Sequence, residues 1–290
     1  MPDRPAIDPA RVRRSFDRCA RDYEGAAALA REVAGRMLER LDLVRMQPAR
    51  VLDLGSGAGR VAGALLARYR RAHAVALDFS LEMLRTGRRA PTFWDRWRAP
   101  RCHPVCAAME RLPFADGTFD MVCSNLALEW SADPEQVLRE VRRVLRRGGL
   151  MMFSTLGPDT LQELRAANAG RWAGPPLADM HDVGDALVRQ GFVGPVMDAE
   201  RITLTYPDVR ALLSELRAIG CAGAIRPVSA GLRGRTWLAR MEQGYREFER
   251  DGRVPASVEV VYGHAWKPEQ PSGVTEDGRA VIRFISRPGC

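Results

Sequence analysis

The sequence predicts an α/β fold in which helices cover both faces of a doubly wound, mostly parallel seven-stranded sheet. Strand and helix patterns alternate over residues 50–155, as such a sheet requires. The apolar run at residues 51–54 carries Asp53 near its end, and a glycine-rich turn and a helical stretch follow it. A second apolar run, at residues 73–78, also ends in an acid, Asp78. These observations predict a ligand site at the carboxyl ends of the first strands.

The segments outside the alternating region supply the remaining elements. Residues 1–48 have a loosely helical apolar pattern. Beyond residue 155, the sequence predicts the following elements: helices over 160–169 and 183–190, a sixth strand over 196–206, a helical excursion over 207–250, a final strand over 257–266 and a short edge strand over 281–285. We therefore expect an N-terminal helical lid (1–48), a ligand-binding core (49–206), a helical cap insert (207–256) and strands that complete the sheet (257–290). Lid and cap should lie over the ligand site.

Composition indicates an ordinary globular chain of 290 residues with a net charge of +8. Because no apolar run approaches the roughly 20 residues of a membrane span, and the N-terminus lacks the apolar core of a signal peptide, we expect a cytoplasmic protein without membrane contact. The six cysteines do not form a convincing zinc motif, and we expect Cys106 and Cys123 to be buried and reduced. The positive charge favours an acidic partner, but no nucleic-acid motif accompanies it.

The glycine turn at residues 55–60 has the letters GSGAGR. A dinucleotide-binding turn of the G-x-G-x-x-G type would require glycine where Arg60 stands. The nearby carboxylate of Asp53 would repel a pyrophosphate but attract an ammonium group. S-adenosylmethionine (SAM) offers that ammonium, and its carboxylate suits the free N–H groups at a helix start. The turn resembles motif I of the class I SAM-dependent methyltransferases.

Three further stretches resemble the same superfamily, in the order in which it carries them. Asp78 stands 19 residues after Gly59, the spacing of an acid that accepts hydrogen bonds from ribose hydroxyls, although it could also cap the next helix. It opens the letters DFSLEML, followed by ERLPF at residues 110–114 with FDMV at 119–122, and RRGGL at 146–150. The resemblance implies a Rossmann-like methyltransferase core with SAM as cofactor and no metal.

Stretches outside that core resemble one family, the malonyl-acyl-carrier-protein O-methyltransferases of biotin synthesis. They are FDRCA at residues 16–20, SNLALEW at 124–130, FSTLGPDTL at 153–161, DMHDVGD at 179–185, LRAIG at 216–220 and EVVYGHAW at 259–266. The resemblance implies methylation of the free carboxylate of a malonyl thioester, on acyl carrier protein or coenzyme A. The malonyl methyl ester so formed primes the synthesis of biotin's pimeloyl chain.

One position departs from the family pattern. Family members often carry an acid two residues before the equivalent of Glu110, where it meets the adenine amino group, but here that position is Ala108. Two other interpretations therefore stay open. The chain could be a SAM-dependent methyltransferase or hydroxylase-like relative with another substrate, or a SAM-binding assembly protein without turnover.

The candidate site residues divide by role. The predicted cofactor-binding residues are Asp53, Gly55, Ser56, Gly57, Asp78, Phe79, Met83, Met109, Glu110, Asn125 and Leu126. Tyr23, Asn125 and Trp130 are expected at the reacting end of the site, with simple packing as the alternative for both aromatic residues. Arg14, Arg165 and Arg217 are candidates to pair with the acceptor carboxylate, because arginine presents a planar fork to it. A carboxylate is already ionised near neutral pH, so the reaction needs no general base.

Overall fold

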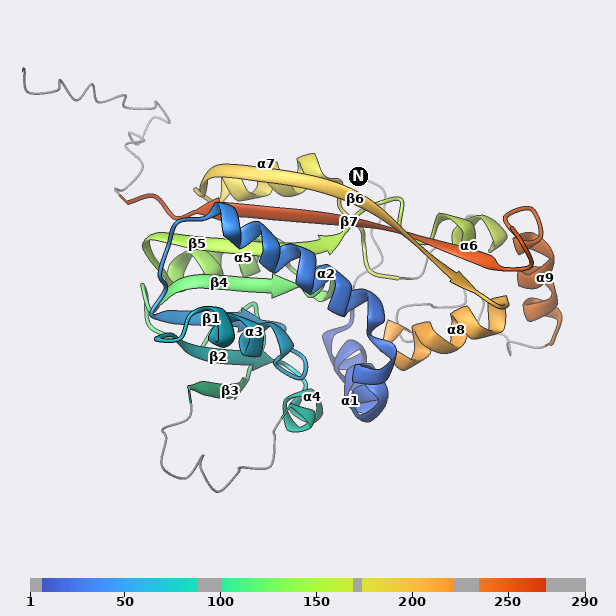
Figure 1. Cartoon of the computed structure of the whole chain (residues 1–290), viewed down its shortest axis with the longest axis horizontal. Coiled ribbons are helices and arrows are strands. Elements are labelled where there is room, and N and C mark those ends of the chain that lie inside the picture. The colour runs from blue at the N-terminus through green and yellow to red at the C-terminus, as the bar shows by residue number, and fades with distance from the viewer. Residues whose placement is uncertain (1–6, 88–100, 169–173, 222–234, 270–290) are drawn as a thin grey trace, which may run out of the picture.

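The structure is a computed structural model that describes residues 7–87, 101–168, 174–221 and 235–269 (Figure 1). Its centre is a seven-stranded sheet with the order β3-β2-β1-β4-β5-β7-β6. The strands are β1 (Arg50–Leu54), β2 (His73–Asp78), β3 (Cys102–Cys106), β4 (Phe119–Asn125), β5 (Leu145–Leu156), β6 (Val193–Tyr206) and β7 (Val254–Trp266). The first five strands pair in parallel, and β7 pairs antiparallel with β5 and β6. The predicted fold class is confirmed.

Helices cover both faces of the sheet because its central strands are apolar on both sides. Successive residues such as Val51 and Leu52 on β1 enter different apolar clusters, as the two-residue period of a strand requires. One cluster packs under α2 (Ala28–Glu39) and α3 (Arg60–Arg68), and the other packs under α5 (Pro134–Val144) and α7 (Met180–Arg189). Figure 1 shows α2 and α3 in front of the sheet and α5 behind it.

Acidic N-caps set the start of several helices. Asp8 caps α1 (Pro9–Ala26) and Asp133 caps α5, and each accepts a backbone N–H of the first turn. A proline stands at the start of both helices, where its missing N–H costs nothing. Asp208 caps α8 (Val209–Ala218) in the same way. These caps fix where the helices near the site begin.

The carboxyl ends of the parallel strands are covered by helices from three parts of the chain (Figure 1). β6 and β7 are longer than the central strands, and their far ends pack with α6 (Gln162–Ala167), α8 and α9 (Arg235–Tyr245) in a third apolar cluster. α1 packs on α4 (Leu81–Thr86) through Phe16, Ala20 and Met83. Ser15 Oγ of α1 also donates to the carbonyl of Gly220 at 2.8 Å, just beyond α8. Helices thus lie over the ligand site, as predicted, whereas the expected division at residues 48, 206 and 256 stays a prediction.

Several boundaries differ from those expected. β6 and β7 begin three residues earlier than predicted, and the helical excursion contains α8 and α9 on either side of residues 222–234. The first four residues of the RRGGL stretch, 146–149, are part of β5, beside a register shift in its pairing with β4. Cys123 is buried as expected, but Cys106 is exposed, because β3 is the edge strand and its side chains are less covered. The expected strand over 281–285 lies outside the described residues.

Candidate active site

Three neighbouring pockets lie at the carboxyl ends of the parallel strands. The glycine-turn pocket is lined by Tyr23, Glu24, Ala27, Ala30, Arg31, Ala34, Asp53, Gly55, Ser56, Gly57, Ala58, Arg60, Val61 and Asn125. The β2 pocket is lined by Pro9, Val12, Gly55, Leu77, Asp78, Phe79, Ala107, Ala108, Met109, Glu110 and Trp130. Gly55 belongs to both, so the two pockets meet at the glycine turn. A larger apolar cavity adjoins them.

The glycine turn favours glycine for its backbone conformation and, at Gly55, for a close contact with a neighbouring side chain. Gly55, Gly57 and Gly59 all have positive φ, between 55° and 80°. A Cβ on Gly55 would lie 2.3 Å from the Cβ of Ala127. The N–H groups of Gly55 and Ser56 donate to the carbonyl of Leu77 at 2.8 and 2.9 Å. These bonds tie the turn to the end of β2, so the N–H groups that begin α3, rather than those of Gly55 and Ser56, are left for an anionic ligand.

Two buried carboxyl groups flank the turn. Asp53 is 1% exposed, accepts the N–H of Ala62 in α3 at 2.8 Å, and has a pKa that burial raises to about 7. Asp78 accepts the N–H groups of Gly57 and Ser80 at 2.8 Å each, and burial raises its pKa to about 6. Ser80 caps α4, so Asp78 is not the N-cap of that helix. Both acids therefore sit where a cationic or hydroxyl-bearing ligand would stabilise their ionised forms.

The end of β4 is held in one geometry. Asn125 donates from Nδ2 to the carbonyl of Ala30 at 3.1 Å, and its Oδ1 accepts the hydroxyl of Ser154 at 2.9 Å. Leu126 then adopts a left-handed conformation with φ of 49°, which costs about 1–2 kcal/mol for a residue with a Cβ. Its N–H is satisfied by the backbone carbonyl of Ser154. Asn125 lines the glycine-turn pocket and Leu126 lines the apolar cavity, so this strand end joins the two.

Two aromatic side chains separate the pockets from the apolar cavity. Tyr23 lines both the glycine-turn pocket and the cavity, and Trp130 lines both the β2 pocket and the cavity. Phe16 holds them, with ring centroids 6.4 Å from Tyr23 and 5.2 Å from Trp130. Burial raises the pKa of the Tyr23 hydroxyl well above its usual range, so the phenol is uncharged at neutral pH. Because Tyr23 and Trp130 also pack against Phe16, a packing role for each is compatible with a place at the reacting end of the site.

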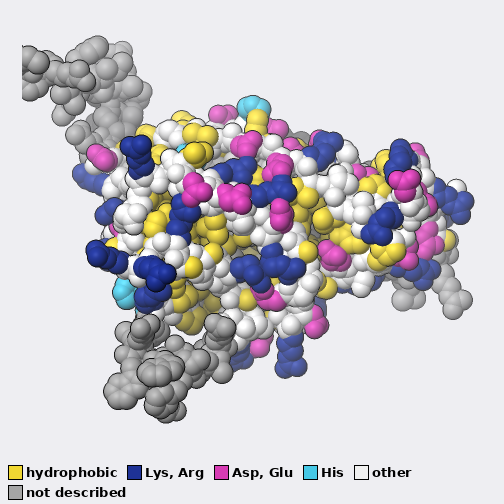
Figure 2. Space-filling view, in the orientation of Figure 1, with side chains coloured by type: hydrophobic (Ala, Val, Ile, Leu, Met, Phe, Trp, Pro, Cys, Tyr) yellow, Lys and Arg dark blue, Asp and Glu magenta, His cyan; other side chains and the backbone are white. Residues whose placement is uncertain are grey.

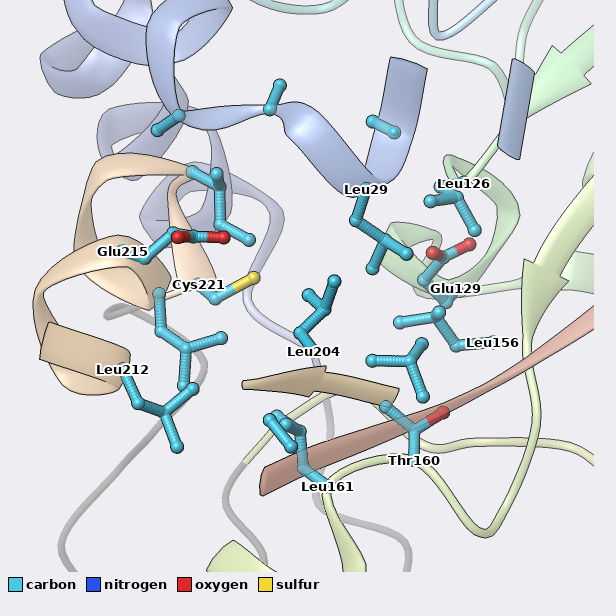
Figure 3. Close-up of a pocket in the computed structure, with 18 of the residues that line it drawn as sticks. Leu29, Leu126, Glu129, Leu156, Thr160, Leu161, Leu204, Leu212, Glu215 and Cys221 are labelled. Atoms are coloured by element: carbon cyan, nitrogen blue, oxygen red, sulfur yellow. The ribbon is translucent and has the colours of Figure 1, made fainter. Parts of the chain in front are cut away.

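The apolar cavity is assembled from α1, α2, the ends of β5, β6 and β7, and α8 (Figure 3). Leucines dominate its wall, among them Leu29, Leu156, Leu204 and Leu212. Two carboxyl groups also line it, from Glu129 in the short η3 turn (Leu128–Trp130) and from Glu215 in α8. Within the described part of the chain, no lysine, arginine or histidine lines this cavity. It suits a mainly apolar guest with a few polar atoms.

Most predicted site residues gather here, and four do not line these pockets. Met83 is buried beneath the turn, where a Cβ on Gly57 would lie 3.2 Å from its terminal methyl. Arg14 and Arg217 are exposed and Arg165 is partly buried, and none of them lines the three pockets described above. The roles assigned to these residues stay predictions.

Sequence reasoning missed the residues that arrive from distant segments. Val12 and Arg31 come from the N-terminal helices, Tyr206 from β6 and Glu215 from α8. No pattern of residue spacing in the sequence predicts these contacts, because they depend on how the helices pack over the ends of the strands. Glu129 lies inside the SNLALEW stretch. The only hint in the sequence that it belongs to the site is that an acidic residue stands there among apolar neighbours.

Comparison with known proteins decides the family. Residues 52–153 match the family model described as "Methyltransferase domain". A malonyl-[acyl-carrier protein] O-methyltransferase from Laribacter hongkongensis is 51% identical over 286 residues, covering 96% of each chain. One from Methylovorus is 48% identical over 285 residues, covering 97% of this chain and 96% of the relative. The chain belongs to this family. It is a SAM-dependent O-methyltransferase, as predicted.

Solved structures agree on the fold. The YcgJ protein from Bacillus subtilis aligns with a TM-score of 0.58 at 15% identity, covering 83% of this chain and all of that one. The [4+2]-cyclase SpnF aligns with a TM-score of 0.51 at 19% identity, covering 82% of this chain and 81% of that one. A methyltransferase-like fold therefore does not by itself fix the reaction.

The donor set fits SAM, the confirmed cofactor. The buried hydroxyl of Ser56 has no hydrogen-bond partner among the described residues, so it is left for a ligand atom. The carboxyl groups of Asp53 and Asp78 stand beside the glycine turn that carries this hydroxyl. The described residues contain no cluster of three or more candidate metal ligands. None of the helices described is long and apolar enough to cross a membrane.

Proposed function

We propose that the protein methylates the free carboxylate of a malonyl group carried as a thioester on acyl carrier protein. The single observation that supports this most strongly is the near-complete match to relatives of that name, over 96% of the chain. The match includes the N-terminal helices and α8, which build the apolar cavity. Those segments, rather than the common core, select an acceptor.

We assign the two smaller pockets to the cofactor. Asp53 would face its ammonium group, and the N–H groups at the start of α3, with Arg31, would face its carboxylate. Asp78 would accept from the ribose hydroxyls. Phe79, Met109 and Glu110 would surround the adenine, because all three line the β2 pocket. Tyr23 and Asn125 then stand where the methyl group enters the cavity.

The chemistry required of the protein is positioning. When bound, SAM supplies a methyl group on a positively charged sulfur. The acceptor carboxylate attacks that methyl in line with the departing sulfur, so no proton is abstracted and no base is required. Tyr23 and Trp130 would keep water away from the two charges and hold the acceptor in line.

Acyl carrier proteins are acidic, which suits a net charge of +8. A cytoplasmic location and a role in supplying biotin's pimeloyl chain follow from the same assignment. The relatives that match this chain over nearly their whole length are named O-methyltransferases. They therefore favour neither a hydroxylase-like relative or methyltransferase with another substrate, nor an assembly protein without turnover. Ala108, which lines the β2 pocket, is compatible with catalysis, since the neighbouring Met109 N–H can still meet the adenine ring.

Methyl-labelled SAM and loaded carrier protein test the proposal. Malonyl carrier should take up label in a base-labile ester, whereas acetyl carrier should take up none, because only malonate has a second carboxylate. Malonyl-coenzyme A, run in parallel, shows how much of the affinity depends on the carrier. Equal labelling of both carriers, or cofactor binding without transfer, would refute the proposed function.

A further inference from the structure

Glu129 is the one acid of the apolar cavity that lacks a full set of partners among the described residues. Its side chain is 6% exposed, and its Oε2 accepts the hydroxyl of Thr155 in β5 at 3.1 Å. Its Oε1 is buried and has no hydrogen-bond partner in the part of the chain that the structure describes. Figure 3 shows the carboxyl group between Leu126 and Leu156, at the cavity wall. A buried polar atom left unpaired in this way is costly, and it marks a place for a ligand atom.

The surroundings of Glu129 favour its neutral form. Its ionisable neighbours on the cavity are Tyr23 of α1, Tyr206 of β6, Glu215 of α8 and Cys221, and none of them is a cation. The hydroxyl of Thr155 is the partner from β5, and α5 contributes no charged side chain to the cavity wall. Burial raises the pKa of Glu129 to about 7. Below that pH, the group has a proton to donate.

Among the described residues of the cavity wall, an entering acceptor carboxylate would meet no cation. Two carboxyl groups that meet in an apolar site share one proton, because both cannot stay ionised at short range. An O–H donor to a carboxylate makes a short, charge-assisted hydrogen bond. A protonated Glu129 can thus bind a carboxylate as an arginine or lysine would.

We propose that Glu129 acts as the acceptor-binding acid, donating a hydrogen bond from Oε1 to one oxygen of the acceptor carboxylate while the other oxygen attacks. The assignment rests on the proposed function. Methyl transfer forms an oxygen–carbon bond and breaks a carbon–sulfur bond, and the sulfur keeps the electron pair, so Glu129 keeps its proton throughout. The neutral ester product is a weaker partner than the carboxylate, which favours its release.

The sign of the pH dependence follows from this role. Because acceptor binding requires the proton, kcat/KM for malonyl carrier at saturating SAM should fall about tenfold for each pH unit above the pKa of Glu129. Glu129→Gln keeps a donor that cannot ionise, so its kcat/KM should stay flat over the same range and exceed the wild-type value at high pH. The difference should appear in KM rather than in kcat.

Two further variants make the readout specific. Thr155→Val removes a hydrogen bond that lowers the pKa of Glu129, so the fall should move to higher pH. Glu215→Gln makes the same chemical change at the other acid of the cavity, which already accepts a hydrogen bond from the hydroxyl of Tyr206 at 2.9 Å. In this variant, kcat/KM should still fall at high pH. SAM affinity and melting temperature of each variant report whether the fold is intact.

The outcomes separate the two proposals. Suppose that the wild type labels malonyl carrier, but that kcat/KM of Glu129→Gln falls with rising pH in parallel with the wild-type value. The role of Glu129 is then wrong and the proposed function stands. The same conclusion follows if the wild-type kcat/KM rises with pH. If the wild type labels no malonyl carrier at any pH, the proposed function fails and the acceptor role fails with it. If Glu129→Gln does not fold, a Thr155→Val profile that coincides with the wild type contradicts the role.

Discussion

The glycine-turn pocket and the apolar cavity share Tyr23 but are built in different ways. One side of the pocket is a continuous strand, turn and helix, whose shape is fixed by backbone bonds from Gly55 and Ser56 to Leu77, and the N-terminal helices also line it. The cavity is closed by side chains from segments more than 200 residues apart, such as Phe16 and Val258. The pocket contains a buried carboxyl group and a buried hydroxyl, whereas leucines dominate the wall of the cavity. Proteins that share this fold can therefore bind the same cofactor and yet accept different methyl acceptors, because the residues that line the cavity differ.

Gly55 should give the largest effect on the cofactor side. In Gly55→Ala, the new Cβ meets Ala127 and the backbone must keep a positive φ, so we expect stability to fall by about 2–4 kcal/mol and SAM binding to be lost. Gly63→Ala in α3 is the matched control, because nothing lies within 4 Å of its Cβ, and it should be neutral or stabilising by about 0.5–1 kcal/mol. Thermal unfolding and calorimetry measure both. Normal SAM affinity in Gly55→Ala would show that the turn is not rigid.

Substitution of Asp53 should give the second largest effect, again on the affinity for SAM. Asp53→Asn keeps an acceptor for the N–H of Ala62 but removes the charge that faces the ammonium group, so SAM affinity should fall by about 1–3 kcal/mol. The wild-type pKa of about 7 adds a signature. SAM favours the ionised form, so wild-type affinity should weaken as pH falls through 7, and Asp53→Asn should lack that part of the dependence. Calorimetry that finds equal affinities at pH 8 would contradict this role.

Ala108 should give the smallest effect, and in the opposite direction. Ala108→Asp adds an acceptor for the adenine amino group in the β2 pocket, so SAM affinity should rise by about 1 kcal/mol with the cavity unchanged. Titration calorimetry at one pH is sufficient. Weaker binding by a folded variant would mean that the β2 pocket is packed differently around the adenine.

The sequence identified the residues that line the two smaller pockets far better than those that line the cavity. Asp53, Gly55 and Asp78 could be placed because strand ends and glycine turns carry local signals. Glu215 and Tyr206 could not, because their position depends on how α8 and β6 pack at the far end of the sheet. The three arginines proposed as acceptor partners were chosen for their charge and planar shape, and none of them lines the cavity, whose described wall is mostly apolar with two acids.

We propose that the methyl donor and the acceptor occupy separate compartments that meet at Tyr23. Leu204→Trp tests this division, because Leu204 of β6 lines the cavity (Figure 3) and does not line the glycine-turn pocket. The larger side chain should fill the cavity, so labelling of malonyl carrier should be lost while SAM affinity by calorimetry stays at the wild-type value. Labelling at the wild-type rate, or a parallel loss of SAM affinity in a folded variant, would contradict the claim.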